Sequence, residues 1–153
     1  MLRQARRLSN DETQNLTQLE NVWYEGSDGS ADHYNWTRYH ALNLHSVFYR
    51  GTVEWRCFNS TLHAGRASAY VNLCLAISAQ AIAQRSTVMR KTQSENELFT
   101  FRTWLVRMGL NGAEFKNTRN HLLANLEGDR AWRYDKDQYP SAKKKKKSRE
   151  SER

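Results

Sequence analysis

The chain has 153 residues, of which 39% are hydrophobic and 26% charged, with seven glycines and one proline. This composition is typical of one globular domain and argues against a disordered or fibrous chain. The formal net charge is +8, but residues 1–7 contribute +3 and residues 141–153 contribute +5, so residues 8–140 sum to zero. The expected folded part therefore lacks the net positive charge that is typical of proteins that bind nucleic acid.

The sequence also bears on the cellular compartment. No window approaches the roughly 18 uninterrupted apolar residues of a membrane span, and the N-terminus lacks the apolar core of a signal peptide. We therefore expect a cytoplasmic protein. The two cysteines, Cys57 and Cys74, follow no CxxC spacing and have apolar neighbours, so we expect both to be buried free thiols in a reducing compartment.

The residue pattern divides the chain into three parts. Residues 1–9 are a basic N-terminal segment, residues 10–140 the expected domain, and residues 141–153 a lysine-rich tail. The tail has low complexity and cannot pack a core, so we expect it to be disordered.

The domain is expected to begin with a short helix and a loop. Residues 10–23 carry aliphatic residues at helical spacing behind an Asn10 or Asp11 cap. Residues 25–32 are rich in glycine, serine and aspartate and lack a large apolar anchor, which indicates an exposed loop.

Two strands are predicted next, over residues 34–49 and 52–58. Only Arg50 and Gly51 separate them, so an antiparallel hairpin is expected. In the second strand an apolar set should face the core, while Glu54 and Arg56 point together to the other side. The apolar set is Val53, Trp55 and Cys57.

Three helices are predicted to follow, over residues 66–84, 95–108 and 113–126. A capping box that begins at Ser94 opens the second helix, and the third ends at Gly128. The first helix carries a broad apolar stripe, comprising Ala67, Tyr70, Val71, Cys74, Leu75, Ile77, Ser78, Ala81 and Ile82. The element order predicts an α+β fold, an antiparallel sheet packed by helices. A hairpin alone is too small a sheet to leave its edges exposed, so we expect something else to complete it.

Glu54 and Arg56 are the most informative polar pair. An acid and a guanidinium on one strand face place a hard-metal ligand beside a group that binds phosphate or carboxylate. A surface salt bridge across strands is the alternative, and spacing alone favours that alternative.

Other motifs carry less information. His40, His45 and His63 follow no zinc-ligand spacing, and the chain lacks the common nucleotide-binding and hydrolase motifs. The helix pair over residues 95–126 is interpreted as two packed core helices rather than as a DNA-binding helix-turn-helix.

Two runs of residues are more specific than a strand pattern. One is R-Y-x-x-L-N, which begins at Arg38, and the other is G-T-x-E-x-R-x-F-N-x-T-L-H-A-G over residues 51–65. Together they resemble the C-terminal half of the amidoligase family, which has a glutamine-synthetase-like carboxylate–amine ligase fold. The resemblance extends over roughly residues 18–134.

This resemblance implies ATP- and Mg²⁺-dependent ligation of a carboxylate to an amine through an acyl phosphate, on a curved antiparallel sheet backed by helices. Glu54 would match the metal-binding glutamate, and Arg56 the arginine that contacts phosphate or the substrate carboxylate. Arg38 and Asn43 would line the same cleft, and His63 is a further candidate on the following loop. Phosphoryl transfer uses divalent cations and guanidinium groups in this way, to position the reactants and stabilise charge.

The chain departs from the family in length. A complete member is considerably longer, and its N-terminal half supplies further metal-binding glutamates and histidines. We therefore expect a truncated domain, of a kind often carried by mobile elements, that is inactive unless a separate N-terminal half or a second copy completes the sheet. The alternative is a non-enzymatic binding module whose basic tail contacts nucleic acid or an acidic partner. A third interpretation takes the tail as a solubilising extension.

Overall fold

The computed structural model describes residues 16–134 and separates the chain into two compact units. The first unit contains residues 16–62 and 78–91, and the second contains residues 63–77 and 92–134. The regular secondary structure of the described residues consists of helices and one two-stranded antiparallel sheet. The fold class is therefore α+β, as predicted.

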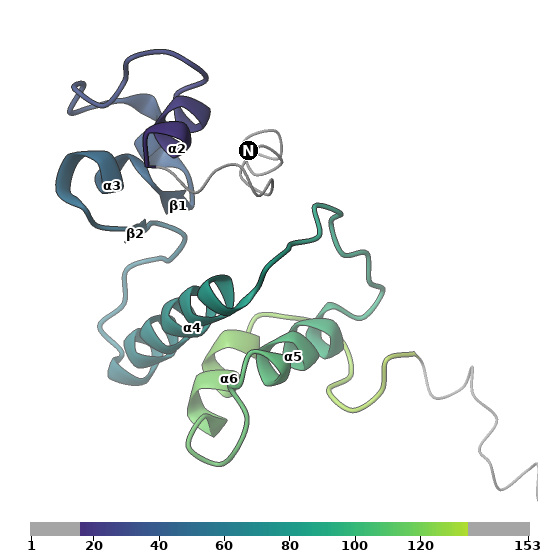
Figure 1. The fold of residues 1–153 in the computed structure, drawn as a ribbon. Coiled ribbons are helices and arrows are strands. Elements are labelled where there is room, and N and C mark those ends of the chain that lie inside the picture. The colour runs from purple at the N-terminus through teal and green to yellow at the C-terminus, as the bar shows by residue number, and fades with distance from the viewer. Residues whose placement is uncertain (1–15, 135–153) are drawn as a thin grey trace, which may run out of the picture. The chain divides into compact units, whose positions relative to one another are not determined.

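The first unit contains two short strands among short helices (Figure 1). Its elements are α2 (Leu16–Trp23), the 3-10 helix η1 (Trp36–Tyr39), β1 (Leu42–Asn43), α3 (His45–Arg50) and β2 (Glu54–Trp55). Its core begins at the end of α2, where Trp23 and Tyr24 are buried. The Trp23 indole Nε1 donates a hydrogen bond to Oγ1 of buried Thr37 at 2.9 Å, which ties α2 to η1.

The prediction of a strand over residues 34–49 was wrong, because asparagine side chains bond locally instead. The Asn35 Oδ1 accepts hydrogen bonds from Thr37 N at 3.0 Å and Thr37 Oγ1 at 2.7 Å, and thereby caps η1. The Asn43 Oδ1 accepts from His45 N at 2.9 Å where α3 begins. Such short side-chain bonds offer the backbone an alternative to a continuous strand ladder. Of the predicted strand, only Leu42–Asn43 forms a strand, β1.

The predicted antiparallel pairing is present, with Leu42 opposite Trp55 and Asn43 opposite Glu54. The predicted tight hairpin was wrong, because helix α3 lies between the two strands. Gly51, in the left-handed region at φ 71°, then ends α3. The expected core face of residues 52–58 was also wrong, since Val53 and Cys57 are exposed. The pairing is too short to hide these side chains.

The long helix predicted over residues 66–84 is confirmed as α4 (Ala64–Ala83), but its predicted buried face was wrong. The buried residues of α4 are Ala69 and Leu73, which both lie outside the predicted stripe. Three large members of that stripe are instead exposed, namely Val71, Leu75 and Ile82. Because α4 is apolar on nearly all sides, its periodicity did not single out the packed face.

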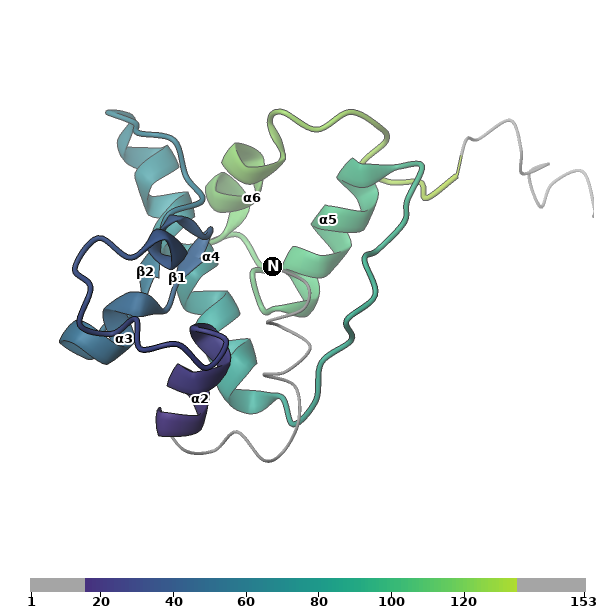
Figure 2. The same ribbon diagram turned by 90° about the horizontal axis from the view of Figure 1, so that it is seen from above.

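The second unit packs α5 (Glu97–Arg107) beside α6 (Lys116–Leu123) (Figure 2). The N-cap of α5 is Asn96, whose side chain accepts a hydrogen bond from Phe99 N at 2.9 Å, so the predicted cap at Ser94 is two residues early. Helix α6 is held to the preceding turn by Arg119, which donates to the carbonyls of Leu110 and Gly112. The buried aliphatic residues of this unit are Ala69, Leu73, Leu98, Leu105, Leu110 and Leu123.

The loop over residues 25–32 is largely exposed as predicted, but it has an anchor. Gly29 is buried, and a side chain at this position would collide with the Tyr24 ring. Predictions for residues 1–9, for a cap at Asn10 or Asp11, and for the tail over residues 141–153 lie outside the described residues. Among the described helices, none combines the length and apolarity needed to cross a membrane.

Candidate active site

A polar cleft of about 460 Å³ lies beside the paired strands of the first unit. It is lined by His33, Arg38, Asn43, His45, Ser46, Arg50, Thr52, Val53, Glu54 and Trp55. Two of these residues are arginines and one is a carboxylate, so the lining carries a formal charge of +1 with histidines neutral. Such a cleft favours an anionic ligand while still offering a carboxylate oxygen to a cation.

Glu54 is held in place by the strand register. Because Asn43 lies opposite Glu54, the Asn43 Nδ2 donates a hydrogen bond of 2.6 Å to Glu54 Oε2. The Ser46 hydroxyl, from the first turn of α3, donates to the same oxygen at 3.5 Å and accepts from Asn43 Nδ2 at 3.1 Å. Asn43 is only 1% exposed and is fixed in turn by His45 N, so the carboxylate is positioned rather than mobile.

Glu54 is ionised near neutral pH. The hydrogen bond from Asn43 lowers the pKa of the Glu54 carboxyl below its usual value, and the charges of Arg56 and Arg38 lower it further. Partial burial of the carboxyl opposes this shift. The side chain is still 46% exposed, which leaves the carboxylate accessible to a ligand.

Arg56 pairs with Glu54, but not across strands as the alternative interpretation of the sequence held. The Arg56 Nη1 lies 3.4 Å from Glu54 Oε1, and Arg56 directly follows β2, the strand to which Glu54 belongs. Exposed pairs of this kind contribute little to stability, about 0–1 kcal/mol. The pair is therefore better understood as placing the Arg56 charge beside the cleft, which Glu54 lines, than as a structural bond.

Arg38 also lines this cleft. The Arg38 Nη1 donates to the His33 carbonyl at 3.3 Å, and the guanidinium carbon lies 5.4 Å from the Tyr34 ring centroid and 5.8 Å from that of Tyr39. Four of the five predicted site residues, Arg38, Asn43, Glu54 and Arg56, are thus brought together in one place.

His63, the fifth, belongs to the second unit. Its Nδ1 accepts a hydrogen bond from Arg66 N at 3.2 Å at the start of α4, and its ring lies 4.9 Å from the ring of His121. This local role accounts for the residue, and its part in a site stays a prediction.

Sequence reasoning missed a buried pair formed by Tyr24 and His45, of which His45 lines the cleft. The Tyr24 hydroxyl and His45 Nδ1 share a hydrogen bond, and both side chains are buried. Burial lowers the pKa of His45, as does the nearby Arg38 charge, while burial and the acids Glu20, Asp28 and Asp32 raise the pKa of Tyr24 to about 12. His45 is therefore neutral and Tyr24 protonated near neutral pH. No local motif marks this pair, because 21 residues separate its members.

The other histidines give no metal centre. His40 packs edge-on against the Trp23 ring at 5.1 Å and the Trp36 ring at 5.6 Å. Within the described range, no group of three or more histidine, cysteine, aspartate or glutamate side chains is placed to hold a metal ion. A cation bound at Glu54 would therefore need its remaining ligands from the molecule with which it binds.

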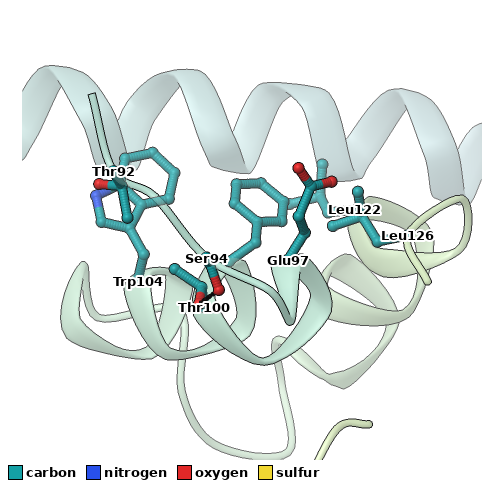
Figure 3. Close-up of a pocket in the computed structure, with 8 residues that line it drawn as sticks. Thr92, Ser94, Glu97, Thr100, Trp104, Leu122 and Leu126 are labelled. Carbon is teal, nitrogen blue, oxygen red and sulfur yellow. Dashed lines mark hydrogen bonds between the residues drawn. The ribbon is translucent and has the colours of Figure 1, made fainter. Parts of the chain in front are cut away.

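The second unit has an apolar pocket of about 450 Å³ (Figure 3). Figure 3 shows Trp104 and Glu97 rising from α5 on the side where Leu122 and Leu126 lie. The Glu97 carboxylate lies in the first turn of α5, where the positive end of the helix dipole stabilises its negative charge. The pocket has no cationic lining residue, so the polar cleft is the better candidate for chemistry on anions.

Comparison with known protein families agrees with the motifs at this cleft. Residues 1–78 match the model of the family described as "Putative amidoligase enzyme". The chain belongs to this amidoligase family. The match includes Arg38, Asn43, Glu54, Arg56 and His63. No curated protein and no solved structure gives a significant match to the chain.

The amidoligase match also limits the resemblance noted in the sequence. It ends at residue 78, before α5 and α6, so the similarity expected as far as residue 134 extends beyond it. The relation to a glutamine-synthetase-like fold stays a prediction. The two-stranded sheet agrees with the predicted partial α+β domain of an amidoligase.

Proposed function

We propose that the polar cleft is the nucleotide and substrate site of an ATP- and Mg²⁺-dependent carboxylate–amine ligase. The observation that carries this proposal is the ionised Glu54 carboxylate, held by Asn43 beside the guanidinium groups of Arg56 and Arg38. Membership of the amidoligase family supports the class of reaction.

The charges at the cleft suit a ligand that carries both a cation and an anion. Glu54 offers the oxygen ligand that Mg²⁺ prefers, and Arg56 and Arg38 offer planar donors for phosphate or carboxylate oxygens. The present Glu54–Arg56 pair is weak and exposed, so Arg56 is able to leave Glu54 and contact a phosphate oxygen. The carboxylate is then available to the cation.

The residues fit a magnesium ion that arrives with its nucleotide. Magnesium is commonly held by one or two protein carboxylates, water and substrate phosphates, and Glu54 supplies one such carboxylate. When bound, the magnesium nucleotide supplies the phosphoryl group that activates a carboxylate toward an amine. Arg56 and Arg38 position that substrate and stabilise its negative charge, and Asn43 keeps Glu54 ionised and oriented.

We also propose that a separate N-terminal half, or a second copy of the chain, completes the domain. Each strand of the sheet has two residues, which is too little to stand alone as a catalytic platform. Helix α4 has no charged residue from position 67 to 83, and Val71, Leu75 and Ile82 are exposed on one face of it. A helix that is apolar on all sides is normally buried, so this face supports a partner.

Calorimetry tests the proposed ligand. The full chain is titrated with a non-hydrolysable ATP analogue, with and without Mg²⁺, and compared with Glu54→Gln, which keeps the shape of the side chain and removes its charge. Glu127→Gln, an exposed acid in the second unit, is the matched control. We expect Mg²⁺-dependent binding by the wild type and the control and its loss in Glu54→Gln. Equal binding by Glu54→Gln would contradict the proposed role of Glu54.

A further inference from the structure

Three large aromatic side chains of the first unit are exposed within a stretch of six residues, over residues 34–39. Tyr34 is 73% exposed, Trp36 66% and Tyr39 69%. We call these three residues the aromatic patch. Single exposed apolar side chains are ordinary on a protein surface, whereas a cluster of exposed rings marks a binding surface.

Two arginines connect the aromatic patch to the polar cleft. The Arg38 guanidinium contacts the rings of both Tyr34 and Tyr39. The Arg56 guanidinium carbon lies 5.3 Å from the Tyr39 ring centroid, while its Nη1 is paired with Glu54. These groups therefore lie in a defined order. The Tyr39 ring is next to the guanidinium groups of Arg38 and Arg56, and the Arg56 guanidinium is next to the Glu54 carboxylate.

This order of groups matches the parts of a nucleotide. An aromatic ring face stacks on a nucleobase, a guanidinium group binds phosphate oxygens, and a carboxylate binds the accompanying cation. We infer that the aromatic patch holds the base of the nucleotide whose phosphates contact Arg38 and Arg56, with Tyr39 as the main stacking surface. This inference rests on the function proposed above.

Single-stranded nucleic acid is the other ligand that stacks on exposed aromatic residues. Binding of single-stranded nucleic acid needs a basic groove that follows the phosphate backbone of the nucleic acid, whereas residues 8–140 have no net charge. The Glu54 carboxylate, paired with the Arg56 guanidinium that lies next to Tyr39, also favours a ligand that brings its own cation. A mononucleotide with Mg²⁺ therefore agrees better with the observed charges.

The test separates the base from the phosphates. Affinities of the full chain for a non-hydrolysable ATP analogue and for inorganic triphosphate are measured by calorimetry in Mg²⁺, for the wild type, Tyr39→Ala and Tyr39→Phe. Tyr134→Ala is the matched control, because Tyr134 is an exposed tyrosine of the second unit with an arginine, Arg133, 5.3 Å from its ring centroid. Circular dichroism checks that each variant is folded.

Loss of one base stack should weaken the ATP analogue at least about fivefold in Tyr39→Ala and leave triphosphate unchanged. Tyr39→Phe and Tyr134→Ala should bind both ligands as the wild type does. If Tyr39→Ala binds the ATP analogue as well as the wild type does, the inference is overturned and the proposed function stands.

Two further outcomes also decide the question. If the folded wild type binds neither ligand, the proposed function fails and the inference falls with it. A labelled oligothymidylate is titrated in parallel. Binding of this oligonucleotide that is lost in Tyr39→Ala, without binding of the ATP analogue, would assign the patch to single-stranded nucleic acid and overturn the inference.

Discussion

Replacing Asn43 by alanine tests how the cleft holds its carboxylate. The change removes the bonds from Asn43 Nδ2 to Glu54 and to the Ser46 hydroxyl, and the bond from His45 N to Asn43 Oδ1. Bonds to charged groups contribute about 1.5–3 kcal/mol, and the 46% exposure of the Glu54 side chain places this one at the low end. Loss of the bond at the start of α3 costs about 1 kcal/mol, as for a helix cap. We expect Asn43→Ala to lower the free energy of unfolding by about 2–3 kcal/mol.

The effect should depend on pH in a defined direction. Asn43 lowers the pKa of the Glu54 carboxyl in the folded state, so its contribution is present above the unfolded pKa of that carboxyl. The contribution is lost as the pH falls through the folded pKa. The difference in stability between wild type and Asn43→Ala should therefore be larger near neutral pH than in acid.

Urea unfolding followed by tryptophan fluorescence, near neutral pH and in acid, measures both quantities. Asn72→Ala is the control, because it removes one neutral bond, from Asn72 Nδ2 to Thr118 Oγ1, in the second unit. Its cost should be about 1 kcal/mol and should not depend on Glu54. A loss below about 0.5 kcal/mol in Asn43→Ala, the level of an ordinary surface change, would refute this reasoning.

Three other predictions concern parts of the chain away from Glu54. Gly29→Ala should destabilise the first unit by at least about 1 kcal/mol in thermal unfolding, because its Cβ meets the buried Tyr24 ring, and unchanged stability would contradict that packing. Leu75→Lys on α4 should reduce the self-association or partner binding of the wild type in analytical ultracentrifugation, whereas a wild type that is monomeric and binds no partner would remove the need for a second polypeptide. Deleting residues 141–153 should leave binding of the ATP analogue unchanged; steep salt-dependent binding of nucleic acid that vanishes with this deletion would favour the binding-module alternative.

The helices were predictable from the sequence where one apolar pattern dominates. Helix α4 was found because a long uncharged run with helical spacing has few other solutions. The prediction of a strand over residues 34–49 was wrong because Asn35 and Asn43 use their side chains to start helices. An alternating sequence pattern does not reveal such side-chain hydrogen bonds. This error concerns the site directly, because the same Asn43 that ends β1 also holds Glu54.

The site was predictable only in part. The two-residue spacing of Glu54 and Arg56 already placed them side by side, and the family motif added Arg38 and Asn43. Ser46 was missed because it reaches Glu54 from the first turn of α3, a helix that was predicted as strand. Tyr24 and His45 meet through the packing of α2 against α3, and contact between such distant residues leaves no local signal.

We propose above that Glu54, with Asn43 and Arg56 around it, binds a magnesium nucleotide. The most direct measurement is a titration of the labelled full chain with Mg²⁺ and a non-hydrolysable ATP analogue, followed by the NMR signals of the Asn43 side-chain amide and the Arg56 guanidinium. We predict saturable shifts of both signals that require Mg²⁺ and disappear in Glu54→Gln. If the wild type is folded but its Asn43 and Arg56 signals do not move, the proposed binding of a magnesium nucleotide at Glu54 is contradicted. This holds whether ligand-induced shifts are absent altogether or lie only in the second unit.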